Sequence, residues 1–307
     1  MRRCFIKSGR TAALALLGLL LAGGGGAQAQ DEARPDTLGV WDMALTSKLS
    51  TTQAAYSNWT EGGISTLAFS AGLSGKAHRR TTRWEQTYDL RLALGFIRQD
   101  SFRKADDLIE LAAALQYEGD GFFATFNPTV AADARTQFAA GFNYDEGPDE
   151  LQREDAPDPN PPVKVSAFMS PGTFTQTVGL TYDPRPWLTQ RFGPSAKETV
   201  VTIERLRPIY GLAPGAPVRF EAGLASTTKL DREVFENVRL KSTLGLFSAL
   251  AGGGSATPDV RFENIVTMQV NEWLGVDFEF TALYDQEISD AAQVKEVLSV
   301  GVTYVFI

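Results

Sequence analysis

The stretch VKEVLSVGVTYVFI, from Val294 to Ile307, decides the fold class. Its residues alternate in polarity with a period of two. The apolar set comprises Leu298, Val300, Val302, Tyr304 and Phe306, and the mixed set comprises Lys295, Val297, Ser299, Gly301 and Thr303. Successive side chains of a strand point to opposite faces of a sheet. This stretch is therefore predicted to be a β-strand with one apolar face and one mixed face.

The same pattern recurs upstream. Between Arg83 and Arg98, one face carries large apolar residues and the other carries charged and small residues. Between Leu274 and Tyr284, apolar residues again alternate with Gly, Asp, Glu and Thr. A soluble sandwich also alternates in this way. Small, uniform residues between the charges of the polar face, and aromatic residues at strand ends, favour a membrane barrel over a sandwich.

Twelve such segments are predicted from Val40 onward. They cover residues 40–56, 63–76, 82–98, 104–119, 121–142, 163–182, 196–210, 217–228, 235–250, 258–270, 273–285 and 293–307. An even number of strands returns both chain ends to one side of a barrel, with short turns there and longer loops opposite. The predicted fold is an all-β, transmembrane, antiparallel up-and-down barrel over residues 40–307, closed by pairing of the last strand with the first.

The N-terminal segment has the features of a secretory signal. Arg2, Arg3, Lys7 and Arg10 precede an apolar run, and Ala27-Gln28-Ala29 supplies small residues for cleavage. A signal peptide is predicted over residues 1–29, followed by a polar leader at 30–39. Removal of its four positive charges changes the net charge from −8 to −12. The predicted location is a bacterial outer membrane.

The predicted polar faces carry both signs of charge. The candidate lumen-lining residues are Glu85, Asp89, Arg91, Glu110, Arg219, Glu221, Arg239, Lys241, Arg261, Glu263, Asp277, Glu279 and Lys295. On the lipid side each charge would cost roughly 2–4 kcal/mol at the midplane, so these side chains are expected to face inward. They are interpreted either as a polar permeation path or as ion pairs that fill a narrow interior.

Aromatic residues mark where the strands are expected to meet the membrane interfaces. The candidates are Trp59, Trp84, Tyr117, Tyr284, Tyr304 and Phe306. Trp59 belongs to YSNWTEGG, at the first predicted long hairpin, where Asn58 and Trp59 could also contact a ligand.

The composition gives little support for catalysis or cofactor binding. The only cysteine, Cys4, precedes the apolar run of the signal, and the only histidine is His78. His78 could serve as a hydrolase base, but its predicted position in a short turn favours a basic contact with lipid headgroups or with a periplasmic polymer. No catalytic residue, cofactor or metal site is predicted; only carboxylate oxygen sites would be possible. The acidic balance also argues against a nucleic-acid partner.

The segment 143–162 is rich in acidic residues and proline. Such a composition cannot build a core. It is interpreted as a solvated external loop or as a calcium or partner site.

Several sequence blocks recur together in a recognisable order. They are YSNWTEGG (56–63), KADDLIEL (104–111), TQFAAGF (136–142), FMSPGTF (168–174), GPSAKETVV (193–201), ENVRLKSTLGLFS (236–248), VRFENIVTMQVNEWL (260–274) and KEVLSVGVTYVF (295–306). Their order resembles an uncharacterised outer-membrane barrel family of Bacteroidetes-type bacteria, domain of unknown function 3078. The resemblance covers residues 40–307 and implies a barrel, with no assigned activity. The expected pattern ends on the aromatic residue, whereas here Ile307 follows Phe306.

The terminal strand also resembles the signal read by the bacterial barrel-assembly machinery, which is therefore an expected partner together with the lipid bilayer. The leading functional prediction is a pore for small polar solutes. The alternatives are a non-conducting barrel whose external loops bind a partner, and, with less support, an outer-membrane enzyme.

Overall fold

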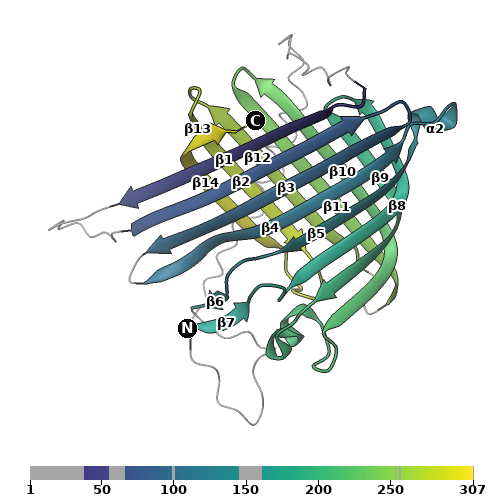
Figure 1. Cartoon of the computed structure of the whole chain (residues 1–307). Coiled ribbons are helices and arrows are strands. Elements are labelled where there is room, and N and C mark those ends of the chain that lie inside the picture. The colour runs from purple at the N-terminus through teal and green to yellow at the C-terminus, as the bar shows by residue number, and fades with distance from the viewer. Residues whose placement is uncertain are drawn as a thin grey trace, which may run out of the picture. The chain divides into compact units, whose positions relative to one another are not determined.

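The computed structural model describes residues 38–54, 66–98, 101–144, 161–252, 254–255 and 257–306. In this part of the chain, twelve antiparallel strands form one closed barrel (Figure 1). The strand order around the barrel is β1-β2-β3-β4-β5-β8-β9-β10-β11-β12-β13-β14, after which β14 pairs with β1. The predicted fold class and strand number are thus confirmed.

The barrel strands are long enough to cross a bilayer at a tilt. They are β1 (Trp41–Ala54), β2 (Thr66–Arg80), β3 (Trp84–Arg98), β4 (Phe102–Tyr117), β5 (Asn127–Thr136), β8 (Gly172–Arg185), β9 (Leu188–Val200), β10 (Val218–Phe235), β11 (Val238–Gly252), β12 (Asp259–Gln269), β13 (Leu274–Tyr284) and β14 (Gln293–Val305). The short strands β6 (Gly141–Asn143) and β7 (Val163–Ser166) form a separate two-stranded sheet.

The two ends of the barrel differ. At the end where β1 begins and β14 finishes, called the turn end, the connections are 81–83, 118–126, 186–187, 236–237 and 270–273. At the opposite end, called the loop end, they include the long segments 137–171 and 201–217. The two longest connections thus share the loop end, as predicted, although the connection 118–126 at the turn end is longer than a tight turn.

The terminal strand closes the barrel against the first strand, as predicted. Ser47 pairs with Tyr304 and Ser50 pairs with Gly301. A Cβ atom at Gly301 would collide with the Ser50 hydroxyl, so this seam requires a residue without a side chain. Closure removes the unpaired strand edges that would otherwise be costly in lipid.

The outer face of the barrel is apolar. Val178 is 61% exposed and Leu298 is 67% exposed, and many other large apolar side chains on the outward rows are also exposed. An apolar outer wall around a polar interior is the arrangement of a transmembrane barrel. In the described part of the chain, none of the helices has the length and apolarity needed to cross a membrane.

Four predicted strands have boundaries that are wrong by more than five residues. The strand predicted at 217–228 ends seven residues too early, since β10 continues to Phe235. The segment 121–142 was expected to be one strand, but it contains the helix α2 (Phe122–Thr125), β5 and β6. Gly121 adopts a φ of 62°, which turns the chain before β5 can begin. The predicted strand 163–182 divides into β7 and β8, which are separated by a tight turn around Pro171.

The predicted strand 196–210 is displaced. β9 instead covers Leu188–Val200, and the rest of that range forms the 3-10 helices η2 (Glu204–Leu206) and η3 (Pro208–Tyr210). Proline is unusual inside a strand, yet β9 contains Pro194. In the barrel Pro194 faces Leu224 of β10 and is accommodated. His78 was also misplaced: it lies within β2, opposite Thr87, and not in a turn.

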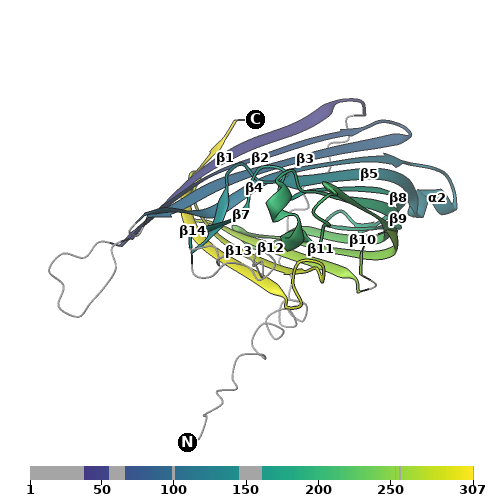
Figure 2. The same ribbon diagram turned by 90° about the horizontal axis from the view of Figure 1, so that it is seen from below.

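The segment 201–217 folds over part of the loop end (Figure 2). Its apolar core consists of Val201, Leu206, Tyr210 and Leu212, against which Ile288 packs. The Tyr210 hydroxyl donates to the carbonyl of Val165 at 3.0 Å. The segment therefore joins the β6–β7 sheet to the connection that follows β13, and we call it the mouth segment.

Candidate functional site

A cluster of five charged side chains bridges the barrel interior; we call it the charge girdle. Its members are Arg91 (β3), Glu110 (β4), Arg135 (β5), Arg261 and Glu263 (both β12). Glu263 accepts hydrogen bonds from Arg135 at 2.7 Å, from Arg261 at 3.0 Å and from Arg91 at 3.3 Å. Neither β3 nor β5 is a neighbour of β12 in the sheet, so two of these contacts cross the lumen.

Glu110 completes the girdle from the other wall. Its carboxylate lies 3.3 Å from Arg91 and 3.5 Å from Arg135. Three guanidinium groups therefore surround two carboxylates. Fork-shaped guanidinium groups and carboxylates form strong, directional pairs. The girdle thus links β3, β4 and β5 to β12 across the lumen.

The other predicted lumen residues are divided among several smaller contacts. Glu85 accepts from His78 at 2.9 Å, Asp89 lies 3.7 Å from Lys229 across the barrel, and Arg239 donates to Asp231 at 2.6 Å. Asp277 pairs with Lys48, and Lys295 pairs with Asp106. Lys241 is opposite Asp231 in the β10–β11 register, and Glu279 is opposite Ile265. These residues therefore do not form one site.

A second cluster centres on Lys197 of β9, near the loop end. The Lys197 ammonium lies 2.5 Å from Asp259, 3.2 Å from Asp285 and 3.7 Å from Glu221. Glu221 also accepts from Arg219 at 3.1 Å, and Arg219 donates to the carbonyl of Tyr210 at 2.7 Å. This Lys197 cluster thus connects three strands to the mouth segment.

Three carboxylates of this region lie close together. Asp259, Asp285 and Glu287 each offer an oxygen within 4.8 Å of the others. Lys197 supplies a compensating positive charge at two of the three, and we assign no metal ion to the group. The predicted absence of a metal site stays a prediction.

Burial and a hydrogen bond to Asp285 raise the pKa of Glu287 above its ordinary value of 4.5. Burial also acts to raise the pKa of Asp285, but the hydrogen bond from Glu287 and the charge of Lys197 outweigh it and lower that pKa below 3.8. Between the two altered pKa values, Glu287 is the protonated member of the pair and Asp285 is the ionised one. The raised pKa of Glu287 means that its contribution to stability is lost as pH rises through it. The lowered pKa of Asp285 means that its contribution is lost as pH falls through it.

We therefore expect the connection 285–292 to loosen as the pH rises from acidic to neutral, when Glu287 ionises beside Asp285. Glu287→Gln should remove this loosening, because its amide can donate to Asp285 at every pH. Hydrogen exchange of the Ile288 and Ser289 amides, corrected for intrinsic rates, measures the effect. An unchanged pH dependence in the variant would exclude ionisation of Glu287 as the cause.

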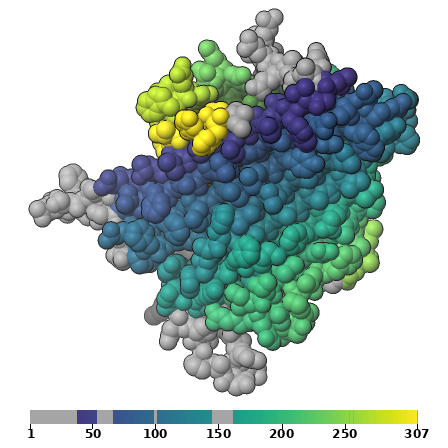
Figure 3. Space-filling view, in the orientation of Figure 1, coloured from purple at the N-terminus to yellow at the C-terminus, as the bar shows by residue number. Residues whose placement is uncertain are grey.

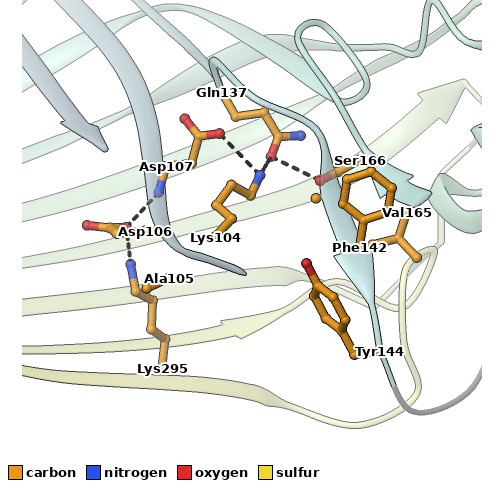
Figure 4. A pocket seen from close by; sticks show the side chains of 11 residues that line it. Lys104, Ala105, Asp106, Asp107, Gln137, Phe142, Tyr144, Val165, Ser166 and Lys295 are labelled. Atoms are coloured by element: carbon orange, nitrogen blue, oxygen red, sulfur yellow. Dashed lines mark hydrogen bonds and ion pairs between the residues drawn. The ribbon is translucent and has the colours of Figure 1, made fainter. Parts of the chain in front are cut away.

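A rim pocket of about 350 Å³ lies between β4, the β6–β7 sheet and β14 (Figure 4). Lys104 donates to Asp107, Gln137 and the carbonyl of Ala139 at 2.8–3.1 Å. Asp107 also accepts from the backbone of Phe138 at 2.7 Å. Lys104 and Asp107 thus form hydrogen bonds with other groups of the protein, and these bonds attach the connection after β5 to the barrel wall.

Sequence reasoning missed several of the residues that complete these clusters. Arg135, Lys197 and Lys229 are cationic partners of predicted lumen residues. Arg135 and Asn127 are an even number of residues apart on β5, so their side chains face the same, inward side of the barrel. Strict alternation with a period of two would therefore have identified Arg135 as a lumen residue. Lys197 was hidden because its strand was displaced.

The described aromatic candidates lie near the ends of strands. Trp84 contacts Tyr117 with ring centroids 5.1 Å apart, and Tyr304 contacts Phe306 at 4.8 Å. Both pairs lie at the turn end, whereas Tyr284 ends β13 at the loop end. Trp59, Asn58, most of the segment 143–162, Ile307 and the predicted signal peptide lie outside the described residues.

One family model matches part of the chain. Residues 51–142 match the family described as protein of unknown function (DUF3078). This match confirms, over that range, the resemblance seen in the sequence blocks. The blocks after residue 142 lie beyond the matched range. No curated protein sequence matches the chain.

Similar folds occur among solved outer-membrane structures. An outer-membrane channel from Pseudomonas putida F1 is 13% identical, with a TM-score of 0.39, and the alignment covers 92% of this chain and 100% of that chain. The translocator domain of the autotransporter NalP from Neisseria meningitidis is 12% identical, with a TM-score of 0.34 and 95% coverage of both chains. Pseudomonas putida OprB is 8% identical, with a TM-score of 0.31 and coverage of 87% and 94%.

Proposed function

We propose that this protein is an outer-membrane pore for small polar solutes, with the charge girdle as its constriction. The observation that carries the proposal is the pair of contacts that Glu263 makes across the lumen with Arg91 and Arg135. A ring of charged side chains at a narrow level is a usual means of solute selection in pores. With three arginines and two glutamates, the girdle has a net charge of +1 and favours anions.

Delivery to the outer membrane by a cleaved signal, and recognition of β14 by the barrel-assembly machinery, are parts of the same proposal. The turn end then faces the periplasm and the loop end faces outward, as short turns and long loops are arranged in such barrels. The proposal includes no catalytic step.

Planar-bilayer recording of the refolded full chain tests the pore. We expect small stepwise currents with a weak anion preference. Glu263→Gln raises the girdle charge to +2 and removes the carboxylate that three arginines share, although Arg91 and Arg135 keep Glu110. It should therefore increase both conductance and anion preference. The matched control is Glu272→Gln in the exposed turn before β13, which should leave both unchanged. A wild-type barrel without currents would contradict the pore.

The alternative is a non-conducting barrel whose loops bind a partner. The mouth segment favours it, because a buried apolar core and the Tyr210–Val165 hydrogen bond hold this segment over part of the loop end. In that case neither the wild type nor Glu263→Gln would conduct, although both would assemble.

A further inference from the structure

The outer wall carries an elongated apolar groove of about 610 Å³. One row of its lining crosses six neighbouring strands from β1 to β8 and consists of Met43, Ala77, Tyr88, Ala113, Ala132 and Gln176. A second, parallel row runs from Leu45 to Phe174. Five strand spacings correspond to about 24 Å, which suits an extended alkyl chain. Figure 3 shows the side of the barrel on which these strands lie.

The groove belongs to the lipid-facing side of the wall. Met43, Tyr88 and Leu111 are each about half exposed, at 47–52%. Residues between them in the strands point inward, as the cross-lumen pair of Asp89 and Lys229 demonstrates. Small residues at Gly75, Ala113 and Ala132 lower the surface between larger side chains, which gives the groove its depth.

A cationic and aromatic group adjoins the β1–β2 end of the groove. Trp41 and Arg79 form the outward pair next to Met43 and Ala77 in the register. The Arg79 guanidinium lies 5.6 Å from the Trp41 ring centroid, and that ring lies 5.9 Å from the ring of Tyr88. Tryptophan and tyrosine settle at the headgroup level of a bilayer, and arginine binds phosphate well. At the opposite end, the exposed amide of Gln176 ends the apolar lining.

We propose that this surface is a phospholipid site, with the phosphate at Arg79 and one acyl chain in the groove. The positive charge of Arg79 favours an anionic phosphate headgroup, and the long apolar lining favours an acyl chain. The proposal is independent of conduction, because all of these side chains lie outside the lumen.

Lipid retention by the assembled full chain tests the site. Native mass spectrometry after detergent exchange would compare dipalmitoyl phosphatidylglycerol with dipalmitoylglycerol, which lacks the phosphate, and with palmitate. We expect one phospholipid per barrel. Arg79→Gln should weaken phospholipid binding about tenfold, because it removes a charge-assisted hydrogen bond, and should leave dipalmitoylglycerol binding unchanged. Ala113→Leu should weaken both by about tenfold through displaced methylene groups.

Two matched controls lie elsewhere on the outer wall. Arg232 lies 5.0 Å from the Trp187 ring, so Arg232→Gln removes a similar cation–aromatic pair away from the groove. Ala282→Leu enlarges an outward residue of β13. Heat-modifiable gel mobility establishes that each variant has assembled. The proposal is overturned if the wild type retains no phospholipid, or if palmitate binds as well as phospholipid. It is also overturned if the control variants lose as much lipid as Arg79→Gln and Ala113→Leu, or if Ala113→Leu dissociates a dimer of barrels in place of releasing lipid.

Discussion

Phe280→Arg is expected to block assembly of the barrel, whereas Thr281→Arg is expected to leave it assembled. Phe280 faces outward from the middle of β13 and packs edge-on against Phe262 with ring centroids 6.4 Å apart. An arginine on the lipid face costs roughly 2–4 kcal/mol near the midplane, in addition to the lost aromatic contact. Glu296 lies opposite Phe280 in the β13–β14 register and offsets part of this cost. Thr281 faces the lumen, opposite Glu263 and Lys295 in the register, where an added charge meets polar groups.

Heat-modifiable gel mobility after refolding into vesicles measures this difference. Adjacent residues on one strand form the matched pair, so the two variants differ mainly in the face of the barrel that receives the charge. Equal loss of the heat-shifted band would mean that the two faces of β13 are assigned incorrectly. Equal retention would mean that β13 does not meet the hydrocarbon core.

Regular strands could be predicted from the sequence because their alternation is local. β3 was expected at 82–98 and lies at Trp84–Arg98; β13 was expected at 273–285 and lies at Leu274–Tyr284. The failures occur where a local signal was overridden. Pro194 occurs inside β9, and a helix with a positive-φ glycine precedes β5. At such positions, pairing with the neighbouring strands decides whether a residue is accommodated in the sheet. These neighbours cannot be read from the sequence of one segment.

The charged clusters were less predictable than the strands. A period of two indicates which side chains face inward, but it does not indicate which strands face one another across the barrel. Arg135 and Glu263 are 128 residues apart and meet only because closure brings β5 opposite β12. The groove on the outer wall has the same origin, since its rows are formed by six strands in register.

Lys197→Met is expected to lower the free energy of unfolding by about 3–5 kcal/mol, as for other buried ion pairs that lose one partner. The Lys197 side chain is only 11% exposed and compensates Asp259, Asp285 and Glu221. Methionine preserves most of the volume and removes the charge, which leaves Asp259 and Asp285 without their cation, whereas Glu221 keeps Arg219. Urea unfolding of the barrel in vesicles, followed by tryptophan fluorescence, measures the loss.

Lys229→Met is the matched control. Lys229 lies 3.7 Å from Asp89, and both side chains are more than one third exposed. Solvent screening limits such pairs to less than about 1 kcal/mol. Removal of the neighbouring acidic charges should rescue Lys197→Met. The triple variant with Asp259→Asn and Asp285→Asn should therefore recover much of the lost free energy of unfolding. If Lys197→Met costs no more than Lys229→Met, the Lys197 cluster does not hold the loop end. If it costs more and the acidic substitutions rescue it, the ammonium is what joins β9, β10 and β12 beneath the mouth segment.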